Sequence, residues 1–125
     1  MTALSTDTRI AITTAMQGLG LKVYTTVPDV PRPPCIVCIP DTPWIRPARV
    51  GSYLNYEVRW RLLVVVSPRN NEAAQLDTET AVDKVLAAVP DGYQVTGVGA
   101  PTLTDIGAQG TVTTTEIQIS VQVKE

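Results

Sequence analysis

Cys35 and Cys38 form the one motif in this chain with a named chemistry, C-x-x-C. A zinc site needs a second pair of ligands, and the sequence has no histidine and no further cysteine to supply them. A thioredoxin-type centre needs the pair at a helix N-terminus, where the dipole activates the thiol. Here Ile36 and Val37 separate the cysteines, which predicts a strand with the two thiols on opposite faces. We therefore expect buried, unreactive thiols and no metal site.

The other groups that could support catalysis are scattered along the chain. Asp77, Glu79 and Asp83 fall within one predicted helix, where a solvated acidic face is the ordinary explanation. The sequence has no calcium-binding loop, no glycine-rich phosphate loop and no histidine to activate a serine. We expect neither an enzyme nor a bound cofactor.

Arginines are concentrated in the middle of the chain, where Asp41 and Glu57 are the only acidic residues between positions 32 and 69. One interpretation is a solubilising face on a half-exposed sheet. The other is a positively charged contact surface, because the guanidinium fork pairs readily with carboxylates at protein interfaces. The sequence leaves both open for the residues concerned: Arg32, Arg46, Arg49, Arg59, Arg61 and Arg69.

Two helices are predicted to support these residues. The first spans about Thr6–Gln17, with apolar residues at helical spacing, and ends at Gly18 or Gly20. The second spans about Asn71–Ala88 and stops at Pro90-Asp91-Gly92.

Strands are predicted from apolar alternation and from short apolar runs. Seven of the ten prolines lie between residues 28 and 47, so a proline-rich, stiffened loop is expected at about 40–52, carrying Trp44. Gly107–Gly110 is expected to form a hairpin turn. The predicted strands are Leu21–Thr25, Cys35–Ile39, Tyr53–Val66, Tyr93–Val98, a segment near Leu103, and Thr111–Lys124.

This order of elements predicts an α+β fold over one domain, residues 1–125. We expect a mixed, mostly antiparallel sheet with two long strands, and two helices packed on one face. The two long strands are the unusual feature. Fourteen extended residues span roughly 46 Å, whereas a domain of this length has a diameter of about 35–40 Å. Part of the sheet should therefore project from the core, and projecting strands usually belong to an interface.

Composition excludes some classes of partner. The formal charge of −2 and a pI near 5.0 argue against a dedicated binder of nucleic acid or anionic membranes. The longest apolar run, Leu62–Val66, is far shorter than a membrane span. No export signal is visible, so we expect synthesis in the cytoplasm.

The layout resembles the tail terminator, or tail completion, proteins of long-tailed, non-contractile bacteriophages. An N-terminal helix leads into VPDVPRPPCIVCIP, and the long strand YEVRWRLLVVV precedes the helix EAAQLDTETAVDKVLAAV. The chain closes on GYQVTGVGAPT and the strand TTTEIQISVQV. The resemblance covers nearly the whole chain and is one of layout, without an invariant signature.

This resemblance implies a structural virion protein that forms a hexameric ring at the head-proximal end of the tail tube. Such a ring ends tube polymerisation and provides the surface that joins the head. Its partners would be other copies of the chain, the tail tube protein and a head–tail connector protein. DNA would pass through the lumen without specific binding, and no membrane is involved.

Two sets of contact residues follow as hypotheses. Residues on the outer face of the first long strand would contact a neighbouring subunit or the lumen: Tyr53, Asn55, Glu57, Arg59 and Arg61. Residues of the proline-rich loop would contact an axial partner: Trp44, Ile45, Arg46 and Arg49.

Other functions stay open. A head–tail connector or tail tube subunit shares a related layout, and a tube protein would grow filaments when purified. A monomeric module or small enzyme that binds a small molecule or peptide between helices and sheet belongs to a different class. A redox function of the cysteine pair is the weakest alternative.

Overall fold

The structure is a computed structural model that describes residues 4–25, 34–50, 53–66, 71–105 and 111–124. Two α-helices, one 3-10 turn and six strands follow one another along the chain, at nearly the bounds that the sequence predicts outside the proline-rich region. They are α1 (Leu4–Met16), η1 (Gln17–Leu19), β1 (Lys22–Tyr24), β2 (Cys35–Val50), β3 (Tyr53–Val66), α2 (Asn71–Ala88), β4 (Tyr93–Val98), β5 (Thr102–Asp105) and β6 (Thr111–Lys124). The predicted turn at Gly107–Gly110 lies outside the described residues.

The strands form one six-stranded sheet in the order β1-β2-β3-β6-β4, with β5 also paired to β6. The β1–β2 pair is parallel and the other pairs are antiparallel. The predicted α+β fold with a mixed, mostly antiparallel sheet is confirmed.

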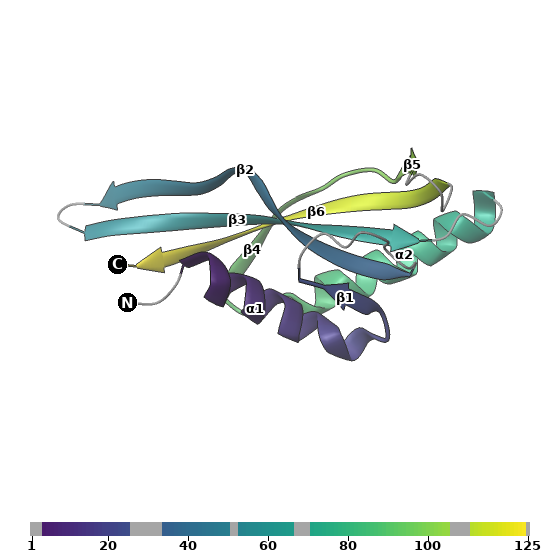
Figure 1. The fold of residues 1–125 in the computed structure, drawn as a ribbon, viewed down its shortest axis with the longest axis horizontal. Helices are drawn as coiled ribbons and strands as arrows, with labels where there is room; N and C mark the ends of the chain where they lie inside the picture. The colour runs from purple at the N-terminus through teal and green to yellow at the C-terminus, as the bar shows by residue number, and fades with distance from the viewer. Residues whose placement is uncertain (1–3, 26–33, 51–52, 67–70, 106–110, 125) are drawn as a thin grey trace.

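The two long strands are also confirmed, because β3 and β6 each run for 14 residues. They pair continuously from Asn55 opposite Lys124 to Val66 opposite Thr113. In Figure 1 the end of β2 and the start of β3 extend well past the N-terminal end of α1. We call this projecting pair, residues 46–50 of β2 and 53–57 of β3, the arm.

Both helices cover the same face of the sheet. Alternate residues of β3 from Val58 to Val66 point to this face and are buried. Ile12 and Met16 of α1 and Val85 of α2 pack against them in one core. This face is mostly apolar, so burying it against the two helices is the main source of stability.

The other face of the sheet is divided along its length. At one end, a second buried apolar cluster contains Cys35, Val37, Val65 and Val112. Toward the arm, the same face becomes polar, because Glu57, Arg59 and Arg61 alternate with the apolar residues of β3.

The prediction of a loop at about 40–52 is wrong for the described part of that segment, because β2 continues to Val50. The strand contains a bulge, in which the four residues 41–44 lie opposite the single residue Arg59. The Thr42–Pro43 peptide bond within this bulge is cis. Beyond Val37, the described part of the sheet places only β3 beside β2. Prolines are tolerated on such an edge strand and at bulges, where no N–H is required.

Candidate functional site

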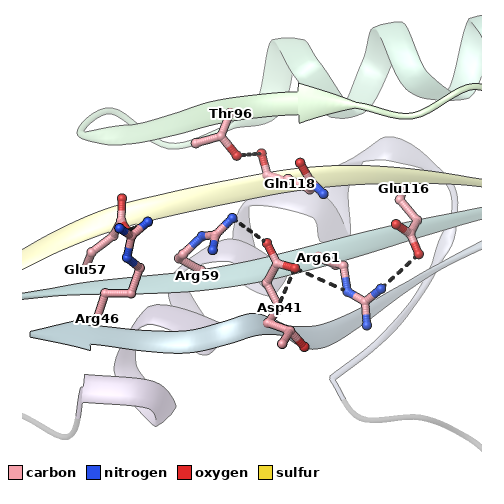
Figure 2. A network of polar contacts seen from close by, with 9 residues as sticks. Asp41, Arg46, Glu57, Arg59, Arg61, Thr96, Glu116 and Gln118 are labelled. Carbon is pink, nitrogen blue, oxygen red and sulfur yellow. Dashed lines mark hydrogen bonds and ion pairs between the residues drawn. The ribbon is translucent and has the colours of Figure 1, made fainter.

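A network of ion pairs lies on the polar face, at the base of the arm (Figure 2). Asp41, in the bulge of β2, is 8% exposed, and its carboxylate lies between two guanidinium groups of β3. The Arg59 Nη2–Asp41 Oδ2 distance is 3.2 Å, and the Arg61 Nε–Asp41 Oδ1 distance is 3.7 Å. Arg61 also donates a hydrogen bond from Nη1 to Glu116 Oε1 at 3.0 Å. The network therefore connects β2, β3 and β6.

The bulge is what places Asp41 in this position. Four residues of β2 opposite one residue of β3 turn the backbone, and the Thr42 N–H donates to Asp41 Oδ1 at 2.8 Å. The two contacts with arginine are charge contacts rather than aligned hydrogen bonds, since Asp41 Oδ2 and Arg61 Nε lack hydrogen-bond partners. Their strength comes from burial, which reduces screening by water.

A second ion pair lies further along the arm. Arg46 Nη1 is 3.6 Å from Glu57 Oε1, and the Arg46 side chain is 61% exposed. Exposed pairs of this kind contribute little to stability. This pair therefore marks accessible polar surface on the arm.

The hypothesis of a positively charged surface is not supported by the described side chains. Arg46, Arg59 and Arg61 each contact a carboxylate, and Glu116 of β6 supplies a negative charge that lies outside the 32–69 segment. Three arginines with three acids give a balanced polar face. Arg32 and Arg69 lie outside the described residues.

The predicted strand-face set is brought together by the fold. Alternate positions of β3 from 53 to 61 share one face, and Asn55, Glu57, Arg59 and Arg61 are each partly exposed. Tyr53 belongs to β3, opposite Val50, and its side chain is outside the description. Glu57, Arg59 and Arg61 are each engaged in an ion pair within the chain, whereas the buried Asn55 Oδ1 atom has no hydrogen-bond partner among the described residues.

The predicted axial set does not form one surface. Trp44 is 40% exposed and packs edge-to-face on Trp60 of the helix-covered face, with ring centroids 5.7 Å apart. Ile45 packs against the same core. Arg46 instead contacts Glu57 on the opposite face. Arg49 lies in β2 opposite Leu54, and its side chain is outside the description.

The two cysteines occupy opposite faces of β2, as predicted. Both are free and buried, Cys38 in the main core and Cys35 in the second cluster. Burial raises the pKa of Cys35 to about 11. Burial also raises the pKa of Cys38 to about 12, an effect that the positive charge of Arg9 partly offsets. Thiols held in the protonated form are poor nucleophiles.

Some residues of this site were missed from the sequence. Asp41 lies in the segment that the sequence predicts as a loop, and Glu116 lies on a different strand from the arginines. Trp60 donates its indole N–H to Thr8 Oγ1 at 2.9 Å, which fixes α1 on the sheet. Tyr93 Oη approaches the carbonyl oxygen of Thr8 at 3.5 Å. Side-chain pairs between segments so distant in sequence leave no local signal.

Within the described residues, no three His, Cys, Asp or Glu side chains are grouped so that they could hold a metal ion. No helix among the described residues is long and apolar enough to cross a membrane. No protein-family model matches the sequence, and a comparison with curated proteins finds no match. The proposals below therefore depend on the geometry of the chain and on the resemblance of its layout.

Proposed function

We propose that this chain is a structural virion protein that forms a ring at the head-proximal end of a phage tail tube. The ring ends polymerisation of the tube, provides the surface that joins the head, and performs no catalysis. The observation that carries this proposal is the arm, a paired extension of β2 and β3 that reaches beyond the helices (Figure 1).

The arm has the properties of a contact element. Within the described sheet, β2 beyond Val37 is paired only with β3, so its outer edge is open. Open strand edges readily pair with another chain unless they are protected. The ion pairs at the base of the arm hold β2 and β3 in one orientation, which lowers the entropic cost of docking. A stable contact with a neighbour would bury at least about 1,000 Å² in total.

The balanced charge of the polar face suits a lumen. The affinity of a protein surface for DNA increases with the number of cationic groups that are free to neutralise phosphates. On the described part of this face, Arg46, Arg59 and Arg61 are each engaged by a carboxylate. DNA would therefore pass such a surface without being gripped.

Shortening the arm tests the proposal. Ala48 and Arg49 lie opposite Asn55 and Leu54, so deleting these four residues removes two cross-strand pairs. Side chains keep their faces, because each strand loses an even number of residues. We expect a folded protein with unchanged unfolding behaviour that no longer forms rings and no longer completes tails.

The readouts are the mass of the purified protein with and without tail tubes, and the length distribution of the tubes. Leu76→Ser, at an exposed position of α2, is the matched control. Closed rings and completed tails with the shortened arm would remove the arm from the proposal. Filaments formed by the unmodified protein would instead indicate a tube subunit.

A monomeric binding module is the second candidate, and one cavity favours it. A cavity of about 390 Å³ lies between α2 and the sheet, lined by residues that include Leu21, Val66, Ala81 and Lys84. This volume is within the range of small-molecule sites. A sharp monomer at every concentration, together with saturable binding of a small molecule, would favour this function.

A further inference from the structure

Arg9 of α1 differs from the other arginines whose side chains are described. Arg46, Arg59 and Arg61 each contact a carboxylate, whereas Arg9 has no acidic partner among the described residues. Its Nε atom is buried and has no hydrogen-bond partner. Burial raises the pKa of Cys38, and the nearby positive charge of Arg9 partly offsets that rise. A partly buried guanidinium without a counter-ion is costly, so binding of an anion beside it is favoured.

Arg9 also lines a cavity of about 230 Å³, whose other walls come mostly from β2 and β3. Arg9 is the one charged residue among the described residues that line it, and most of the others are apolar. The other lining residues are Thr25, Cys38, Ile39, Pro40, Trp44 and Trp60. The cavity therefore combines apolar walls with a single cationic group.

The bulge in β2 shapes this cavity. Residues 41–44 lie opposite the single residue Arg59, and the bulge places Trp44 on the helix-covered face. There Trp44 meets Trp60 edge-to-face, with ring centroids 5.7 Å apart. Trp44 is 40% exposed and Trp60 is 1% exposed, so the first is the accessible wall and the second the buried wall. Bulges commonly lie next to active sites, where they re-aim a side chain.

The size and chemistry of the cavity select one class of ligand. An apolar cavity of about 150 Å³ can hold a benzene ring. A cavity of about 230 Å³ therefore has room for one ring with a short polar arm. The two indoles favour an aromatic ring, and the guanidinium favours a carboxylate, which matches its planar fork. Phosphate and sulfate fit less well, because they need several polar contacts and the described walls offer one cation.

We propose that this cavity binds a small aromatic monocarboxylate, with its ring against Trp44 and Trp60 and its carboxylate paired with Arg9. The site is separate from the cavity between α2 and the sheet, and it does not depend on assembly of the chain into a ring. It gives a role to the bulge and to Trp44, which lie outside the arm.

Tryptophan fluorescence of the full chain tests this site, because Trp44 and Trp60 are the two tryptophans of the sequence. The probe is phenylacetate, and its neutral control of nearly equal size is phenylacetamide. Neither compound absorbs where tryptophan is excited. We expect phenylacetate to change the emission saturably, with a Kd of about 0.1–1 mM for a ligand of this size. Phenylacetamide should bind at least about tenfold more weakly, because it cannot form the ion pair.

Substitutions of Arg9 assign the preference to the guanidinium. Arg9→Gln should remove the preference for phenylacetate over phenylacetamide. Arg9→Lys keeps the charge without the planar fork, so it should keep part of the preference. Lys22→Gln is the control and should leave both titrations unchanged, because Lys22 lies over Tyr24, which packs against the second cluster on the opposite face of the sheet.

Urea unfolding gives a second readout for the same variants. Without ligand, it shows whether each variant is folded. Phenylacetate should raise the urea midpoint of the unmodified chain, because a ligand that binds only the folded state stabilises it. The midpoint of Arg9→Gln should respond equally little to phenylacetate and to phenylacetamide.

Several results would overturn the site. Equal affinity of the unmodified chain for the two probes would reject the pairing with Arg9, and so would a preference that survives in a folded Arg9→Gln variant. The absence of a saturable change up to ~10 mM phenylacetate would reject the site itself. Self-association that Arg9→Gln abolishes, in a chain that does not bind phenylacetate, would assign Arg9 to a contact between copies instead. None of these results bears on the tail function, which the shortened arm tests separately.

Discussion

Replacing Asp41 with Asn changes one charge with almost no change of volume. The amide oxygen of Asn can still accept a hydrogen bond from the Thr42 N–H. In the native chain this N–H donates to Asp41 Oδ1 at 2.8 Å. The contacts with Arg59 at 3.2 Å and Arg61 at 3.7 Å lose their charge. Removing one partner of a fully buried ion pair costs about 3–5 kcal/mol.

The expected cost here is lower than that range. The side chains of Arg59 and Arg61 are 18% and 29% exposed, so water solvates part of each released charge. Arg61 also keeps its hydrogen bond to Glu116 at 3.0 Å. We expect Asp41→Asn to lower the free energy of unfolding by about 2 kcal/mol, between the values for exposed and buried pairs.

Urea denaturation measures this change. With a slope of about 2 kcal/mol per molar urea, the midpoint should fall by about 1 M at unchanged slope. Glu57→Gln is the matched control, because it makes the same chemical change in the exposed pair with Arg46. That control should cost about 0.5 kcal/mol or less.

The reasoning would be refuted if Asp41→Asn cost no more than Glu57→Gln. A double-mutant cycle with Arg59→Gln gives a second check. The two changes should be non-additive by about 1 kcal/mol, because they act on one ion pair. Additive effects would mean that the 3.2 Å contact contributes no stability.

Four further predictions concern the buried groups and the turn. Trp60→Phe should lower the free energy of unfolding by about 2 kcal/mol, because it removes the 2.9 Å hydrogen bond to Thr8 and leaves a gap. Cys35 and Cys38 should resist a thiol reagent at pH 8 until urea unfolds the chain, which absorbance of the released chromophore would report. Their raised pKa values, about 11 and 12 against 9.0 when unfolded, should also make stability fall as the pH rises above 9, by roughly 1.4 kcal/mol per pH unit for each thiol. Gly92→Ala should cost about 1 kcal/mol in thermal or urea unfolding, because its φ is +86°.

The Gly92 and pH predictions each have a matched control. Gly18→Ala should be neutral or stabilising by about 0.5 kcal/mol, because no atom lies near the added Cβ and the backbone is compatible. The pH effect should shrink when Cys35 and Cys38 are both changed to Ala. Rapid labelling of either thiol in the native chain would contradict the burial on which both thiol predictions depend.

Local pattern was sufficient for most elements of this fold. Strict alternation predicts β3 and β6 over the 14 residues each that the structure assigns. Helical spacing bounded by breakers predicts both helices, and Gly20, with φ of +79°, lies directly after η1. These features depend on the period of side chains along the backbone, which the sequence displays directly.

The candidate site was predicted less well. The pattern places Glu57, Arg59 and Arg61 on one face of β3 correctly, but gives no sign that Asp41 lies between the two arginines. Proline density predicts a loop where β2 continues, because the prohibition on proline applies to strands paired on both sides. Whether a strand lies at an edge is a property of the sheet.

The sequence by itself determined the class of fold, the lengths of the two long strands, the faces of the cysteines and the alternation of charge along β3. Only the tertiary structure decided which acidic residue contacts each arginine of the polar face. Glu116 reaches Arg61 across 55 positions, and Trp44 and Arg46 lie on different faces because of a bulge. Periodicity is a local property of the backbone. The counter-ion of a charged side chain, in contrast, is determined by strand order and register. These arise only when the whole sheet is assembled.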